Sequence, residues 1–144
     1  MKVRFGFVTN SSSSSFIIAK HNECTKEDIR ESFEELRDEI YDFVKNKVTY
    51  IIDRESLKWM DDEDINILKQ LKVLHEESKK DEVIDLMIDH LMKYVDSFES
   101  IKLEPWKVID AYFSNDDDMM ASHFLYYYGF RIKDNERFKF ICND

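Results

Sequence analysis

The side chains most capable of nucleophilic or metal chemistry in this sequence are two cysteines and four histidines. His21 and Cys24 are three residues apart, a spacing that would let an imidazole act as the base for a thiol nucleophile. His123 and Cys142 would complete a zinc-binding set with them if both ends of the chain met in one sheet. The sequence has no paired Cys-x-x-Cys unit, and it supplies no third orienting group beside His21 and Cys24. We therefore expect no catalytic residue, no metal and no other cofactor, and a cysteine or metal hydrolase is the third functional hypothesis.

Phosphate-binding loops need several glycines, because the backbone must approach the ligand closely. Glycine occurs only at Gly6 and Gly129, which excludes a nucleotide-binding loop of that kind. The acidic runs at residues 61–64 and 116–118 lack the spacing and the central glycine of a helix–loop–helix calcium site. Capping of helix N-termini explains both runs. These exclusions predict that the chain is not an enzyme.

Three consecutive tyrosines stand near the C-terminal end of the chain, at Tyr126, Tyr127 and Tyr128. One helix turn cannot bury three adjacent side chains, so at least one of them should face solvent or a partner. Tyrosine is enriched at protein interfaces, since its ring is apolar while its hydroxyl can still form hydrogen bonds. The run therefore predicts an interaction surface, with packing at the edge of the core as the alternative.

The negative charge is concentrated in the middle of the chain. The formal net charge is −10, and residues 23–100 carry 23 acids against 12 bases, a net charge of −11. Such a field repels nucleic acid phosphates, so we expect no direct nucleic acid binding, whereas it attracts a basic protein surface. Asp61, Asp62 and Asp64 are expected to face solvent and to steer such a partner. The alternative function is an acidic inhibitor that mimics nucleic acid and occupies a basic cleft.

The N-terminal string is the most distinctive stretch of the sequence. Phe-Val-Thr-Asn, five serines and Phe, at residues 7–16, resemble the start of a group of small, mostly uncharacterised proteins of bacteria and their phages. The resemblance covers about the first 18 residues. It implies a phage or mobile-element setting and does not indicate any particular activity. The hydroxyls could order a loop, form a recognition tag or accept phosphate. The candidate residues are Asn10, Ser11, Ser12, Ser13, Ser14, Ser15 and Phe16.

Alternating side chains at residues 2–8 predict a strand, paired in a hairpin with a second strand at residues 16–19 across the serine loop. Thr25 and Asp28 resemble a capping box that opens a helix. Residues 48–52 are β-branched or aromatic and predict a third strand. The apolar positions of the helix recur at helical spacing: Ile29, Phe33, Leu36, Ile40, Phe43 and Val44.

The second half of the sequence predicts further helices and a closing hairpin. Asp61, Asp81 and Pro105 each favour a helix start, and Gly129 favours a helix end. The hairpin would turn at residues 134–136. The predicted helices span residues 61–74, 81–95, 105–112 and 118–128, and the predicted hairpin strands span residues 130–133 and 137–142.

These elements predict a mostly helical α+β fold in one globular domain, residues 1–144, with a small N-terminal hairpin and a C-terminal hairpin. Apolar residues make up 43% of the chain, which supplies a core without a disulfide or metal. The sequence lacks a membrane-span pattern and a secretory signal, which predicts no membrane association and a cytoplasmic protein, in the host cytoplasm if phage-encoded. The leading functional hypothesis is a non-enzymatic accessory protein that binds another protein, with its oligomeric state open.

Overall fold

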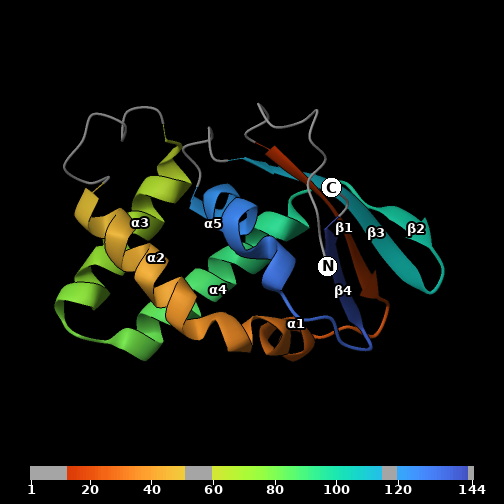
Figure 1. Cartoon of the computed structure of the whole chain (residues 1–144), viewed down its shortest axis with the longest axis horizontal. Coiled ribbons are helices and arrows are strands. Elements are labelled where there is room, and N and C mark those ends of the chain that lie inside the picture. The colour runs from red at the N-terminus through yellow and green to blue at the C-terminus, as the bar shows by residue number, and fades with distance from the viewer. Residues whose placement is uncertain (1–12, 51–59, 115–119, 143–144) are drawn as a thin grey trace.

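The chain folds into one antiparallel sheet with the helices gathered on one side of it (Figure 1). The computed structural model describes residues 13–50, 60–114 and 120–142. The predicted α+β class is confirmed, with strands near both ends of the chain. The α-helices are α1 (Lys26–Phe33), α2 (Arg37–Tyr50), α3 (Asp62–Glu76), α4 (Lys80–Asp96) and α5 (Met120–Tyr128); η2 (Glu34–Leu36) and η4 (Gly129–Arg131) are 3-10 helices; the strands are β1 (Ser13–His21), β2 (Ile101–Leu103), β3 (Trp106–Ser114) and β4 (Phe138–Cys142).

The strand expected at residues 16–19 is present as part of β1, but its partners differ from the expected hairpin. The strand order is β2-β3-β1-β4, and Phe16 pairs with Ala111 of β3 on one side and with Cys142 of β4 on the other. Both edges of this part of β1 are therefore occupied. The expected partner, residues 2–8, lies outside the described residues. Both true partners come from the distant end of the chain, which local sequence patterns do not reveal.

The segment after Pro105 is a strand, so the short helix expected there is wrong. In β3, Ile109, Ala111 and Phe113 are buried while Tyr112 between them is exposed. This period of two places the buried residues on the sheet face that the helices cover. Pro105 lies in the turn between β2 and β3, where its lack of an amide hydrogen does not interrupt strand pairing.

The capping box expected at the start of α1 is confirmed. The amide of Asp28 donates to the hydroxyl of Thr25 at 3.2 Å, and the amide of Thr25 donates to the carboxylate of Asp28 at 2.9 Å. These two bonds satisfy amides that the first helical turn leaves without intrahelical partners. The bond from the Thr25 amide is also the main reason why the pKa of Asp28 lies below its ordinary value.

One buried stripe runs along α1, η2 and α2, as the spacing of apolar residues predicts. In α2 it continues through Ile40, Val44 and Val48, which are buried at intervals of four residues. Residues 48–50 therefore belong to α2, which corrects the strand expected at residues 48–52. Burial of the stripe outweighs the modest preference of β-branched residues for strands. Residues 51 and 52 lie outside the described part of the chain.

The later helices follow their expected positions closely. The carboxylate of Asp61 caps α3 by accepting from the amide of Asp64 at 2.8 Å, and α4 begins at Lys80. Helix α5 ends before Gly129, which opens η4 where the strand at residues 130–133 was expected. The second expected C-terminal strand is present as β4, and it pairs with β1.

The buried core extends from the sheet through all five α-helices, and aromatic rings pack together beneath the sheet. The ring of Phe16 packs on the rings of Phe113 and Phe140, with centroids 5.1 and 5.2 Å away. Tyr94 of α4 approaches Phe113 at 6.0 Å. Gly129 lies directly against Phe16, because a β-carbon at residue 129 would fall 2.7 Å from Cζ of that ring. The close packing of β1 against the start of η4 therefore favours glycine at residue 129.

Candidate functional site

The predicted tyrosine surface lies on α5. Tyr127 is 49% exposed, while Tyr126 and Tyr128 are half-buried. Tyr128 stacks on Phe124 with centroids 5.0 Å apart, and Tyr126 meets Tyr127 edge-on at 4.9 Å. One tyrosine of the three thus faces solvent, as their adjacency on a helix requires.

A groove of about 390 Å³ opens between α2 and α5 beside Tyr127. The ammonium of Lys47 donates to Nδ1 of His123 and lies 5.3 Å from the ring centroid of Phe43. The rings of His123 and Tyr127 are 6.0 Å apart. The groove is lined by Asp42, Phe43, Asn46, Lys47, His123, Tyr127 and Tyr128.

The chemistry of this groove suits recognition of a side chain. Its walls present the rings of Phe43 and Tyr127, which favour apolar and aromatic partners. Lys47 and Asp42 place one cation and one anion at the same groove, and the amide of Asn46 can donate and accept. A volume of a few hundred Å³ accommodates one large side chain of a partner.

The predicted acidic steering residues are divided between surface and interior. Asp61 and Asp62 are exposed at the start of α3. Asp64 is only 1% exposed, which corrects the expectation that it faces solvent. It lies one helical turn before the buried Leu68 and therefore on the inward face of α3.

Asp64 lies against a second buried polar side chain, His90 of α4, which is 6% exposed. Asp64 Oδ1 and His90 Nε2 are 3.3 Å apart, but within the described part of the chain neither ring nitrogen of His90 has an aligned hydrogen bond. A cavity of about 250 Å³ adjoins the pair and is bordered by Lys93 and Tyr94. The sequence gives no signal for this pair, because an isolated histidine in a helical stripe does not indicate its partner.

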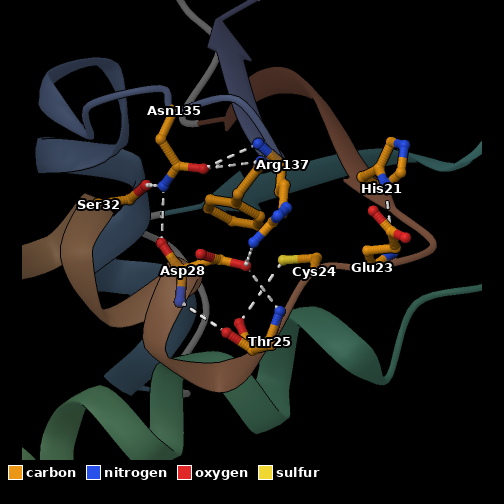
Figure 2. A network of polar contacts seen from close by, with 9 residues as sticks. His21, Glu23, Cys24, Thr25, Asp28, Ser32, Asn135 and Arg137 are labelled. Atoms are coloured by element: carbon orange, nitrogen blue, oxygen red, sulfur yellow. Dashed lines mark hydrogen bonds and ion pairs between the residues drawn. The ribbon is translucent and has the colours of Figure 1, made fainter.

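A polar network ties α1 to the turn before β4 (Figure 2). The side-chain amide of Asn135 donates to the carbonyl of Asp28 at 2.7 Å and to the hydroxyl of Ser32 at 3.0 Å. Its carbonyl oxygen accepts from the amides of Arg137 and Phe138, both at 3.0 Å. This network orders the predicted turn at residues 134–136 and positions β4.

The side chains of His21 and Cys24 have different hydrogen-bond partners in the same region (Figure 2), although the amide of Cys24 donates to the carbonyl of His21 at 2.9 Å. His21 Nδ1 accepts from the amide of Glu23 at 3.0 Å, and the Cys24 thiol donates to the carbonyl of Thr25 at 3.6 Å. Burial raises the pKa of the Cys24 thiol, and the nearby carboxylate of Asp28 raises it further. Since the thiolate is the nucleophilic form, this environment reduces the reactivity of Cys24 at neutral pH.

The structure does not bring Cys142 and His123 to His21 and Cys24. Cys142 pairs with Phe16 in the sheet, five residues before His21 and thus about 16 Å away along β1. His123 lies on α5 at the groove. Among the described residues, no group of three or more histidine, cysteine or acidic side chains could hold a metal ion.

The serine run is described from Ser13 onward. Residues 13–15 form the start of β1, and Ser14, which pairs with Phe113, is 3% exposed. Strand pairing therefore orders this part of the run, which corrects the loop expected through Ser15. Asn10, Ser11 and Ser12 lie outside the described residues.

Sequence reasoning misses a second exposed apolar surface, the sheet face that points away from the helices. Its exposed side chains include Ile101, Leu103, Tyr112 and Ile141. The alternation of side chains in residues 106–114 could have indicated this face. The helix expected after Pro105 assigned the same residues to a different element.

Comparison with protein-family models, with characterised proteins and with solved structures finds no match to this chain. Among the described residues, no helix has the length and apolar character needed to cross a lipid bilayer.

Substitution of Asp64 tests the buried pair. Asp64→Asn places an amide against His90 in place of the carboxyl group, and it should lower the free energy of unfolding by about 1–3 kcal/mol in urea titrations, because a buried polar group loses its fit to its neighbour. Asp62→Asn, a matched change on the exposed side of the same turn, should change it by about 0.5 kcal/mol or less. Replacing both members with leucine should cost less than Asp64→Asn alone. Equal effects of the two asparagine variants would contradict the buried pair.

The raised pKa of Cys24 predicts slow alkylation. In a Cys142→Ser background, the rate of reaction with iodoacetamide should rise with a midpoint above the pKa of an ordinary thiol, because burial disfavours the thiolate. Asp28→Asn should move this midpoint downward, since it removes a neighbouring negative charge. Rapid alkylation at neutral pH would show an activated thiolate and would favour the hydrolase hypothesis.

Proposed function

We propose that this protein acts by binding another protein, without catalysis, and that Tyr127 is the central anchor. The half-exposed ring of Tyr127 beside the groove between α2 and α5 carries this proposal. Contacts with Tyr126 and His123 restrain the ring before binding, so little side-chain entropy is lost when a partner covers it.

The proposed partner presents a basic surface around an apolar or aromatic side chain. The net charge of −11 over residues 23–100 attracts such a surface, and the exposed Asp61 and Asp62 contribute to this attraction. This attraction speeds encounter and is screened over about 8–10 Å at physiological salt. The apolar side chain would enter the groove and contact Phe43 and Tyr127.

The alternative proposal is an acidic inhibitor that mimics nucleic acid, which would need rows of unpaired carboxylates on one face. Asp81, Asp85 and Asp89 form a row along α4, but arginines of α1 and α2 pair with these carboxylates. Arg37 Nη2 lies 3.0 Å from Asp81, and Arg30 Nη1 lies 3.8 Å from Asp85. This mixture of charges favours the anchored protein interface over mimicry. The raised thiol pKa of Cys24 likewise disfavours the hydrolase as the third candidate.

Crosslinking followed by kinetics tests the proposed function. A photo-crosslinking side chain at residue 127 should capture the partner, and one at the exposed Val73 of α3 should not. With that partner, Tyr127→Ala should raise the dissociation rate by about 30-fold, equivalent to about 2 kcal/mol. Combined Asp61→Asn and Asp62→Asn should mainly lower the association rate and its salt dependence, and Val73→Ala should change neither rate.

The opposite pattern would favour mimicry. If the two aspartate substitutions abolish binding while alanine at each of Tyr126, Tyr127 and Tyr128 has no effect, the interface is electrostatic. The nucleic-acid-mimic proposal would then replace the anchored interface.

A further inference from the structure

The outer face of the sheet, turned away from the helices in Figure 1, is largely apolar. Directly paired residues on neighbouring strands point to the same face, so the strand register defines its composition. Ile101 pairs with Val108, and Ile17 pairs with Ile141. The rings of His21 and its paired residue Trp106 meet edge-on with centroids 5.2 Å apart. The paired side chains at the end of β1 therefore also lie on one face of the sheet.

Within the described part of the chain, several large apolar side chains of this face are exposed. Ile101, Leu103 and Tyr112 are 64%, 59% and 63% exposed, and Ile141 is 44% exposed. Strand spacing and rise give the face a footprint of roughly 20 Å by roughly 20 Å. The largest apolar patch of a typical monomer covers about 300–600 Å² and often marks an interaction site.

Among the outward-facing residues of the described strands, one is acidic and one is basic. Asp110 of β3 pairs with Ile17, and Lys139 of β4 pairs with Ala19, so the two charges stand on opposite sides of β1. Their charges cancel, although the whole chain carries −10. A second copy of the chain is repelled by the acidic body but not by this neutral face.

We propose that this face binds a second copy of the same chain, sheet on sheet. A two-fold axis parallel to β1 and above it places the β4 side of one copy over the β3 side of the other. Lys139 of the second copy then lies two residues along the strand from Asp110, about 7 Å, while the two packed sheets are about 10 Å apart. The lysine and aspartate side chains together can span this separation. The same axis repeats the ion pair, so two pairs flank an apolar centre that includes Ile17.

A charge exchange tests this arrangement in the full chain. Sedimentation equilibrium from about 5 to about 500 µM should show a monomer–dimer equilibrium. Asp110→Lys gives the face two bases and Lys139→Glu gives it two acids, so each variant alone should raise the dissociation constant at least about tenfold. An equimolar mixture of the two variants should restore dimerisation, because unlike charges meet again.

Matched variants on α3 separate this contact from an effect of total charge. Glu76→Lys and Lys69→Glu change the net charge by the same amounts at exposed positions, and they should leave the dissociation constant unchanged. Thermal unfolding of each variant verifies that it folds. A monomer at every concentration would overturn the proposal. So would a dimer that the mixture of Asp110→Lys and Lys139→Glu does not restore, or one that the α3 variants weaken equally.

Discussion

The ring of Phe16 lies where three strands and the end of α5 meet. It packs on Phe113 of β3 and Phe140 of β4, and its edge rests on Gly129, where a β-carbon would come within 2.7 Å. Closely packed protein interiors tolerate little added side-chain volume. The position of β1 between two strands from the far end of the chain therefore depends on this contact between a phenylalanine and a glycine.

The register of β1 determines both proposed surfaces. Because strand side chains alternate, placing Phe16 and Ile18 in the core turns Ile17 to the outer face, and a slip of one residue would exchange the faces. On the other side of the core, α5 packs on β3 and contacts α2. That placement leaves Tyr127 beside the groove. The outer sheet face and the groove between α2 and α5 thus lie on opposite sides of one core.

Local signals in the sequence predicted the features that depend on neighbouring residues. The capping box at Thr25, the cap at Asp61 and the exposure of one tyrosine, Tyr127, follow from spacing along a helix. Local signals did not predict the partners of β1 or the strand after Pro105, because pairing between segments far apart in the sequence determines both. The burial of Asp64 was missed for a different reason. Its position one helical turn before Leu68 is a local signal for the inward face of α3, but helix capping explained the acidic run without assigning a face to each member.

A double-mutant cycle on Phe16 and Gly129 tests the central packing contact most directly. Gly129→Ala should lower the free energy of unfolding, measured in urea, by about 1–3 kcal/mol, since the added carbon meets the ring of Phe16. In a Phe16→Leu background the same substitution should cost at least about 0.5 kcal/mol less, because the shorter side chain leaves room. An equal cost in both backgrounds would show that the two residues do not meet, and would contradict this placement of β1.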